Sequence, residues 1–424
     1  MLAMLRVLDL GRGDPPPAPA PLALDPDVVE GVRVILDRVR SEGDRALVAL
    51  TKEHDGADVE GRIRVDPEEI EAAAARVDEG LRAALDAMAE RLMELHRRQL
   101  PSAWEDEREG VRFGETVHAV ETAGCYVPGG RAAYPSSVLM TVCPAHAAGV
   151  ERVVLCTPPA EDASVPDAVL YAARAGGADA VFRVGGAQAI GAMAFGTETV
   201  PAVDTVVGPG NVWVTAAKRE VMGVVGVDAL AGPTELVIVA DGSADPGVLA
   251  VDLVAQCEHD PVARTTLIAL DAGLADAIQD PLRTEVEAGA RGDVVRSALE
   301  HAAAVLVADE EAAADLVDAL APEHLQVVTR DPRAFLERVR FYGAAFLGPH
   351  TAVSLGDYGV GSNHVLPTMA TARFASGLRA AHFVTVSAFT EATAEGAARF
   401  GPEVESVARA EGLDAHARAS EVRR

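Results

Sequence analysis

The sequence is poor in the residues that mark secreted, membrane-spanning and nucleic-acid-binding proteins. Only four of its 424 residues are cysteine, without a CxxC pair, and 37 basic side chains stand against 65 acidic ones, for a formal net charge of −28. So few cysteines argue against a disulfide framework and predict the cytoplasm. The acidic excess argues against nucleic acid or an anionic membrane surface as a partner. Because the chain has neither an apolar run of about 18 residues nor a signal-peptide pattern, membrane insertion and secretion are not expected.

Apolar residues are plentiful, at 49% of the chain, which excludes disorder as its dominant state and is enough to fill the cores of two or more domains. The expected partners are small molecules or other copies of the chain. The proline-rich stretch 15–21 cannot be helical, so it separates an N-terminal arm, residues 1–22, from the body. Residues 28–100 have helical periodicity, and only 63–65 resembles a strand.

After residue 114, short Val-rich runs alternate with Ala-rich helical stretches. This alternation predicts an α/β fold with parallel sheets that helices cover. Eight such runs fit two sheets better than one, and two sheets imply two α/β domains with a cleft between them. The candidate strands are 152–156, 180–184, 204–207, 236–240, 265–270, 303–307, 325–328 and 344–347.

The pattern predicts a discontinuous first domain, residues 23–125 plus 236–377, and a second domain, residues 126–235. Beyond residue 384 the chain is expected to be helical to residue 410, with a break only near 401–402, so that residues 378–424 form a helical tail. Arm and tail both have little core of their own. We therefore expect both to pack on a second subunit.

The first candidate site is Gln256-Cys257-Glu258-His259. Asp245-Pro246 is a good start for a helix, and an apolar run follows it, so Gln256 and His259 project from one face near the helix end. The two side chains could hold a divalent metal. The alternative is a helix-terminal histidine whose ring is satisfied by a carbonyl.

The second candidate is Glu323-His324, which lies between a helix that must end near Pro322 and a strand that begins at Leu325. Glutamate can activate a water and histidine accepts protons near neutral pH, so the pair suits acid–base chemistry. A solvated Glu-His pair in an ordinary connection is the alternative.

The third candidate is the Gly-rich stretch 347–367, which contains His350, Asp357, Asn363 and His364. A long loop of this kind inside a compact domain is more often functional than idle, although a flexible surface loop is the alternative. Asp357 offers a hard oxygen ligand. Together with a glutamine and histidines it suits zinc or a similar first-row metal.

Two Gly-rich turns, 185–188 and 208–211, each follow a predicted strand and precede a predicted helix. Their backbone N–H groups could receive a phosphate or a ribose, or they could be plain turns. The segment 124–137, with Tyr126 and Tyr134, is either a stacking surface beside a cofactor or a packed turn. Cys125 and Cys257 lie in these segments, and each fits a small buried apolar side chain better than a nucleophile.

Taken together, the motifs resemble the histidinol dehydrogenase family of zinc enzymes. The segments that carry the resemblance are SEGDRAL, CYVPGGRAAYPSSVLM, RVGGAQAIGAMAFGT, VDTVVGPGNVWVTAAKREV, AGPTEL, AQCEHD, APEHL and GDYGVGSNHVLPT, in the family's order over residues 41–368, followed by EGLDAH at 411–416. The resemblance implies a four-electron oxidation of L-histidinol to L-histidine through histidinal, with two NAD⁺. It also implies a homodimer with shared active sites, two incomplete Rossmann-like domains and intertwined terminal segments.

The resemblance also implies roles for individual residues. Glu323 and His324 match the catalytic pair. The zinc ligands would be Gln256, His259, Asp357 and His416, with His416 contributed by the partner subunit. The substrate would contact Thr234, Gln256, His259, His324, Asp357, His364, Glu411 and His416. The NAD contacts would be Tyr126, Gln188 and Asn211, which places NAD in the second domain and the metal and catalytic residues in the first.

Thr234 stands where the family usually has serine, which keeps the hydroxyl and adds a methyl group. Three other functions compete with the implied one. A related zinc and NAD dehydrogenase could oxidise another primary alcohol, such as a sulfonated diol. A metal-dependent hydrolase could use the same residues without NAD, and a two-domain binding protein would need no Glu-His pair.

Overall fold

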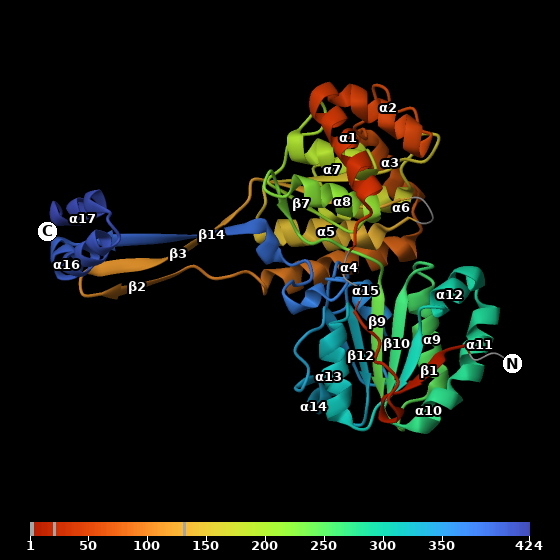
Figure 1. Ribbon diagram of the computed structural model, residues 1–424. Coiled ribbons are helices and arrows are strands. Elements are labelled where there is room, and N and C mark those ends of the chain that lie inside the picture. The colour runs from red at the N-terminus through yellow and green to blue at the C-terminus, as the bar shows by residue number, and fades with distance from the viewer. Residues whose placement is uncertain (1–3, 20–22, 130–132) are drawn as a thin grey trace.

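The computed structural model describes residues 4–19, 23–129 and 133–424, which form two α/β lobes and a projecting arm (Figure 1). We name the lobes by their sheets, the six-strand lobe and the five-strand lobe. In the described part of the chain, no helix combines the length and the apolar character needed to cross a lipid bilayer.

The six-strand lobe is built on a parallel sheet in the order β1-β11-β10-β9-β12-β13. Its strands are β1 (Arg6–Asp9), β9 (Glu235–Ala240), β10 (Arg264–Ala269), β11 (Ala303–Leu306), β12 (His324–Val328) and β13 (Ala344–Leu347). β9 and β12 are buried at every position because helices cover both faces of the sheet.

Two separate apolar cores lie on the two faces of this sheet. One face is covered by α9 (Pro246–Cys257), α10 (Ala272–Ala277), α11 (Gln279–Ala288) and α12 (Gly292–Leu299). The other is covered by α13 (Glu310–Leu320) and α14 (Pro332–Leu336). The short helix α15 (Val353–Asp357) lies within the Gly-rich stretch and packs Val353 into the first of these cores.

The five-strand lobe contains a second parallel sheet, in the order β6-β5-β4-β7-β8. Its strands are β4 (Thr122–Tyr126), β5 (Arg152–Thr157), β6 (Ala180–Arg183), β7 (Thr205–Val207) and β8 (Gly226–Val227). One face packs against α1 (Pro26–Glu42), α2 (Asp44–Asp55), α7 (Gly186–Phe195) and α8 (Val212–Val221). The other packs against α3 (Pro67–Arg76), α4 (Glu79–Arg97), α5 (Pro135–Ala148) and α6 (Asp167–Gly176).

The division of the chain between the lobes differs from the expected one for residues 23–125. The sequence analysis groups them with 236–377, but helices α1 to α4 bury their apolar faces in the two cores of the five-strand lobe. The strand β4 lies in the middle of the five-strand sheet. Helical periodicity identifies a buried face without identifying the sheet that buries it, so the sequence could not decide this point.

All eight candidate strands are present in the structure, as β5, β6, β7 and β9 to β13. Residues 63–65 form only an isolated bridge, between Arg64 and Phe182. The eight were recognisable because fully buried parallel strands are continuous runs of branched apolar residues.

The arm consists of a three-stranded antiparallel sheet and two helices, and it extends away from both lobes (Figure 1). Its elements are β2 (Trp104–Arg108), β3 (Val111–Ala119), β14 (Val384–Ala392), α16 (Ala394–Ala410) and α17 (Asp414–Glu421). The expectation of a wholly helical tail over 378–424 was therefore wrong for β14, which pairs with β3 along its whole length. β-Branched residues such as Val384 and Val386 favour the strand, and α16 runs through Pro402 without a break.

The N-terminal arm was expected to pack on a second subunit, and this expectation was wrong for its described strand. β1 pairs in parallel with β11 of the same chain. Leu5 and Leu8 are buried in the cores on the two faces of the six-strand sheet. Leu5, just before the strand, and Leu8, within it, are an odd number of positions apart, so the extended chain directs them to opposite faces of the sheet. Residues 20–22 of the predicted arm lie outside the described residues.

Three short 3-10 turns complete the described structure, at Leu10–Arg12, Thr371–Arg373 and Ala380–Phe383. The last of these leads directly into β14 and packs Phe383 into a core of the five-strand lobe. The base of the arm is thereby fixed to the body.

Candidate active site

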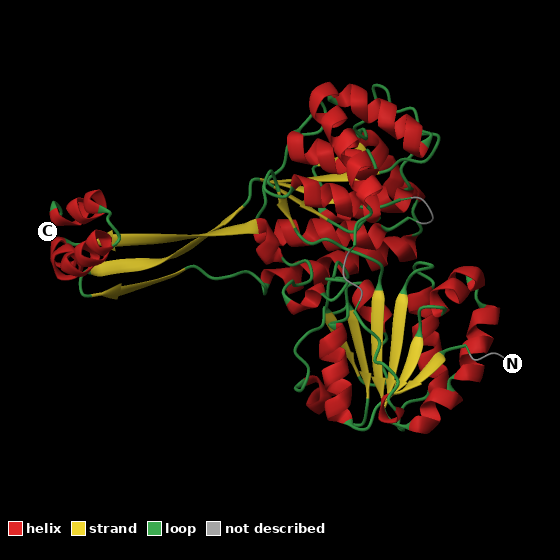
Figure 2. Cartoon of the chain, in the orientation of Figure 1, coloured by secondary structure: helices red, strands yellow, loops and turns green. Residues whose placement is uncertain are grey.

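The predicted acid–base pair lies at the amino ends of two neighbouring strands of the six-strand sheet. Glu323 immediately precedes β12, His324 is the first residue of that strand, and Thr234 immediately precedes β9. Figure 2 shows that these strands begin at the edge of the sheet that faces the five-strand lobe. The pair is therefore placed between the lobes.

A tight turn at Ala321, at the end of α13, places Glu323 and His324 in this position. Ala321 ends α13 with a φ of 44° and a ψ of 61°, a left-handed conformation that alanine rarely adopts. Its N–H donates to the Val317 carbonyl and closes the last turn, and Pro322 cannot continue the helix. The Ala344 N–H then donates to the Glu323 carbonyl, which aligns β12 with β13.

Glu323 is held as a carboxylate by hydrogen-bond donors on one of its oxygens. Its Oε2 accepts the Thr234 hydroxyl at 2.6 Å and the Glu235 N–H at 2.8 Å. Burial raises the pKa of Glu323, whereas the adjacent His324 ring and these hydrogen bonds lower it. The lowering effects together are larger, so the pKa lies below its ordinary value. With 6% of its surface exposed, Glu323 is not the solvated side chain of an ordinary connection.

The His324 ring has one fixed nitrogen and one free nitrogen. Nδ1 lies 3.0 Å from the Glu235 carbonyl and 3.4 Å from Glu323 Oε2. A carbonyl only accepts, so Nδ1 carries a proton and the neutral ring has its lone pair on Nε2. Nε2 is shut off from solvent without a hydrogen-bond partner among the described residues. Burial lowers the pKa of His324, but the carboxylates of Glu323 and Asp357 raise it to about 9.

Gln256 joins this cluster through Thr234. It lies near the end of α9, which Asp245 caps by accepting the N–H groups of Gly247 and Val248. The amide nitrogen of Gln256 donates to the Thr234 hydroxyl, which in turn donates to Glu323. The amide oxygen of Gln256 is therefore the atom that it can offer to a cation or a substrate.

The Gly-rich stretch supplies two more predicted residues, Asp357 and His364. Asp357 Oδ1 lies 3.8 Å from His324 Nε2. The His364 ring is fixed at both nitrogens, with Nδ1 2.9 Å from the Asp357 carbonyl and Nε2 3.1 Å from the Ser137 hydroxyl on α5. Burial lowers the pKa of His364. This stretch is thus an ordered bridge between the lobes, not a free surface loop.

Three other predicted site residues are exposed and make no recorded contact with this cluster in the described structure. His259 is exposed on the turn after α9, three residues from Gln256. His416 and Glu411 are exposed at the far end of the arm, distant from the cluster of the same chain (Figure 1). Across the described ranges, no group of three or more His, Cys, Asp or Glu side chains is arranged to hold a metal ion.

The donors around the cluster are nevertheless of the type that zinc accepts. Gln256 reaches the Glu323–His324 pair through the Thr234 hydroxyl, and Asp357 faces His324 directly, so the two residues offer an amide and a carboxylate oxygen. His259 adds an imidazole one helical turn from Gln256. Two oxygens and one nitrogen leave a tetrahedral set one ligand short, so the residues fit zinc if a further donor comes from outside this single chain.

The three predicted NAD residues, Tyr126, Gln188 and Asn211, line one cavity in the five-strand lobe, of about 800 Å³. It lies at the carboxyl ends of β4, β6 and β7, where open parallel sheets bind ligands. The Tyr126 hydroxyl accepts the N–H of Gly186, and Asn211 caps α8 by accepting the N–H groups of Trp213 and Val214. The two Gly-rich turns are thus strand-to-helix turns, and both contribute to the cavity wall.

A buried ion pair fixes one of these turns. Lys218 and Asp228, each almost fully buried, form a salt bridge. Lys218 Nζ donates to the Gly208 carbonyl at 2.9 Å, and Asp228 accepts the Gly208 N–H at the same distance. Gly208 has a φ of 120° and approaches the Tyr126 backbone so closely that a Cβ would lie 2.1 Å from the Tyr126 carbonyl oxygen. Only glycine fits this position.

Two residues that contact the cluster, Ser137 and Glu235, were not singled out from the sequence, and Asn363 was named there only as part of the Gly-rich stretch. Ser137 binds His364, and Glu235 supplies both backbone groups that hold the Glu323–His324 pair. Asn363 accepts the Val365 N–H and donates to the Met140 carbonyl of the opposite lobe. Ser137 and Glu235 occur within motifs that carry the family resemblance, which was the available signal. All four cysteines are free and buried, and burial raises the pKa of Cys125 to about 12 and of Cys257 to about 11, as expected for apolar packing.

Comparison with known proteins agrees with this geometry. Residues 22–424 match the family model described as histidinol dehydrogenase. The histidinol dehydrogenase of Methanothermobacter thermautotrophicus is 47% identical over 393 residues, which cover 92% of each chain. That of Nitrosomonas europaea is 42% identical over 406 residues, or 95% of this chain and 94% of the relative.

A solved structure extends the similarity to the whole fold. The crystal structure of histidinol dehydrogenase from Elizabethkingia anophelis superposes with a TM-score of 0.95 at 33% identity, and covers 100% of this chain and 98% of that one. By these matches, the chain is an NAD-dependent oxidoreductase. It belongs to the histidinol dehydrogenase family.

Proposed function

We propose that the buried pair Glu323–His324 carries out two successive oxidations, of L-histidinol to histidinal and of histidinal to L-histidine. The observation that carries the proposal is His324 Nε2, which has no hydrogen-bond partner among the described residues and lies at the interlobe edge beside a carboxylate that is held ionised. In the neutral form of the ring, this nitrogen carries the lone pair. An alcohol-to-acid oxidation needs one base that acts twice and one group that activates water between the two steps. The pair provides both.

In the first step His324 Nε2 takes the proton of the substrate hydroxyl while the carbinol carbon gives up a hydride. NAD⁺, when bound, accepts that hydride. In the second step Glu323 removes a proton from water, which adds to the aldehyde carbon and gives a gem-diol. His324 Nε2 then removes a hydroxyl proton from the gem-diol as the second hydride leaves. The net change consumes one water and two NAD⁺ and releases histidine, two NADH and protons.

Gln256, His259 and Asp357, with His416 of a second copy, would hold Zn²⁺ beside this pair. When bound, the ion supplies a fixed positive charge that anchors the nitrogen atoms of the substrate. Thr234 and His364 would contact the substrate from the two lobes, and Glu411 from the second copy. Thr234 also keeps Glu323 oriented in the absence of substrate.

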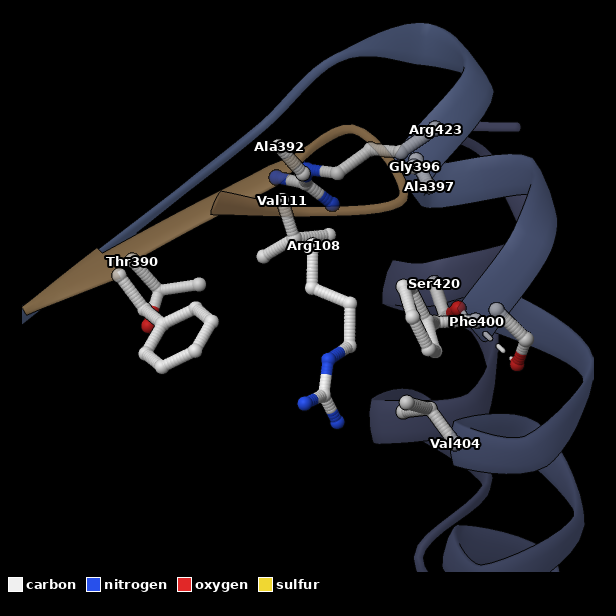
Figure 3. Close-up of a pocket in the computed structure, with 12 residues that line it drawn as sticks. Arg108, Val111, Thr390, Ala392, Gly396, Ala397, Phe400, Val404, Ser420 and Arg423 are labelled. Atoms are coloured by element: carbon white, nitrogen blue, oxygen red, sulfur yellow. Dashed lines mark hydrogen bonds between the residues drawn. The ribbon is translucent and has the colours of Figure 1, made fainter. Parts of the chain in front are cut away.

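The family relationship and the arm together support a homodimer with shared active sites. His416 and Glu411 are carried away from their own cluster, as a residue that serves another copy would be. The arm also leaves apolar side chains exposed at Val386, Val404, Val407, Leu413 and Val422, with exposed fractions between 42% and 60%. Close to its tip, a cavity of about 410 Å³ opens between the sheet and α16 and is lined by Val111, Phe400 and Val404 (Figure 3). A second chain that covers these surfaces would bury them.

We further propose that each lobe is an incomplete Rossmann-like unit, with NAD bound by Tyr126, Gln188 and Asn211 in the five-strand lobe. The metal and the catalytic pair belong to the six-strand lobe. Cytoplasmic residence fits four free cysteines, since disulfides are rare in that compartment.

One assay tests the reaction. Purified protein is incubated with L-histidinol and NAD⁺, and NADH absorbance is compared with the histidine formed. We expect two NADH per histidine, loss of turnover after treatment with a chelator, and recovery after Zn²⁺ is restored. One NADH per product, or unchanged turnover in the chelated protein, would contradict the proposal.

A further inference from the structure

Asp55, the last residue of α2, is half-buried in the wall of the NAD cavity, and one of its carboxylate oxygens has no hydrogen-bond partner in the described structure. It lines the cavity together with Tyr126 and Gln188. Its Oδ2 is shut off from solvent and has no hydrogen-bond partner within the described ranges. Burial raises the pKa of Asp55. A buried, unpaired carboxylate is costly, so a ligand that donates hydrogen bonds to it would gain affinity.

The charges around the cavity favour a ligand that is neutral at this position. Asp55 adds its charge to the negative carboxyl end of α2, and Glu161 also lines the cavity. Among the described residues of the wall, none is arginine or lysine, and His54 alone could carry a positive charge. A phosphate at Asp55 would therefore meet like charge, whereas a hydroxyl would meet an acceptor.

The cavity suits the adenosine half of a dinucleotide. None of its lining residues belongs to the catalytic cluster, so a nicotinamide that reaches His324 must extend beyond it. The amino ends of α7 and α8 open onto the cavity at Gly186 and Asn211, and helix amino ends attract phosphate groups. Exposed Trp213 and the rings of Pro128, Pro158 and Pro159 offer flat apolar surfaces for a purine.

We propose that Asp55 accepts hydrogen bonds from the hydroxyl groups of the adenosine ribose and excludes the 2′-phosphate of NADP, so that it sets the preference for NAD. This inference rests on the proposed binding of NAD in the five-strand lobe. In other dinucleotide-binding folds, an acidic residue at the adenosine ribose distinguishes NAD from NADP in the same way. Here the acidic residue would be at the carboxyl end of a helix.

The test compares Asp55→Asn with Asp55→Glu and with the control Glu161→Gln, which removes an exposed charge from the same cavity. For each variant, the affinities for NADH and NADPH are measured by fluorescence titration, and kcat/KM with NAD⁺ and NADP⁺ is measured with L-histidinol. Asp55→Asn should improve the NADP-to-NAD ratio on the order of tenfold or more, mainly through KM and binding. Asp55→Glu should keep the wild-type preference, and Glu161→Gln should change the ratio much less than Asp55→Asn does.

The direct titrations separate this inference from the proposed reaction, because they do not need turnover. If the wild type binds NADH but does not oxidise histidinol, the proposed function is contradicted, and the titrations still measure the role of Asp55. An unchanged NADPH-to-NADH affinity ratio in Asp55→Asn would overturn the inference. So would an equal gain in Glu161→Gln, since the effect would then be one of general charge. A purely structural role for Asp55 would change stability and leave the ratio as it is.

Discussion

The Thr234 hydroxyl donates a 2.6 Å hydrogen bond to Glu323 Oε2 and at the same time accepts the amide N–H of Gln256. One hydroxyl thus links a proposed metal ligand to the proposed water-activating carboxylate. Serine could make both hydrogen bonds, so the extra methyl group of threonine affects the space around the site and not its polar connections.

Replacing Thr234 by valine tests this link, because valine keeps the shape and removes the hydroxyl. Glu323 would retain only the Glu235 N–H on Oε2, and a buried group that loses a partner costs about 1–3 kcal/mol. We expect kcat for histidinal oxidation to fall roughly 10- to 100-fold. Thr234→Ser is the matched control and should stay close to the wild type. Full activity of the valine variant would show that the hydrogen bond has no part in catalysis.

Substitutions of the acid–base pair should affect the two oxidations differently. His324→Ala removes the base for both and should slow both by about 10²- to 10⁴-fold. Glu323→Ala should chiefly slow the oxidation of histidinal, because only that step consumes water. Steady-state rates with histidinol and with histidinal as separate substrates measure the difference. Equal rates for the wild type and His324→Ala would remove the assignment.

Mixed dimers test whether His416 completes the site of a neighbouring copy. His416→Ala and His259→Ala should each be nearly inactive and bind zinc poorly. After the two are unfolded and refolded together, half of the dimers would be mixed, and each would have one intact site, which gives about a quarter of wild-type activity and zinc content. Refolding each variant alone is the control. If neither activity nor zinc content recovers in the mixture, His416 does not complete the site of the partner subunit.

The stability of the protein should depend on pH through Glu235. Burial, and then the charge of Glu323, raise the pKa of Glu235 from 4.5 to about 7. A folded-state pKa above the unfolded one gives stability that is present below pH 4.5 and is lost as the pH rises through 7. Glu235→Gln should therefore gain up to roughly 3 kcal/mol relative to the wild type between pH 4.5 and 8.

Urea unfolding of metal-free protein across this pH range measures that difference. Glu258→Gln, at an exposed position, is the control and should follow the wild type. A parallel pH dependence of the wild type and Glu235→Gln would mean that Glu235 titrates normally in the folded protein.

The sequence predicted the interior of the fold better than its periphery. β9 and β12 were recognisable because every residue in them is buried. β14 was not, since only Val384 and Phe389 are even partly buried, and its partner β3 lies about 270 residues earlier in the chain. Pairing over that distance leaves no local pattern. β1 is only four residues long and has a single buried residue, so it too gives little signal in the sequence.

The site was predictable in its residue types and not in its assembly. Adjacent Glu323 and His324 pointed to acid–base chemistry, and the structure brings Thr234, Gln256, Asp357 and His364 to the pair. The tautomer of His324 follows from the Glu235 carbonyl, a backbone group that no side-chain motif encodes. Similarly, the contact of His364 with Ser137 joins positions 227 residues apart.

The pairing of β3 with β14 has a consequence for the order in which the protein is made. Both strands are needed for the three-stranded sheet, yet β14 emerges from the ribosome only after the strands of both parallel sheets have been synthesised. Until then the β2–β3 hairpin has no cover, and short isolated hairpins are marginally stable in water. A nascent chain that stalls before Val384 would thus contain all the strands of both lobes and an unpaired β2–β3 hairpin. The projecting arm can therefore form only when the last tenth of the chain has been translated.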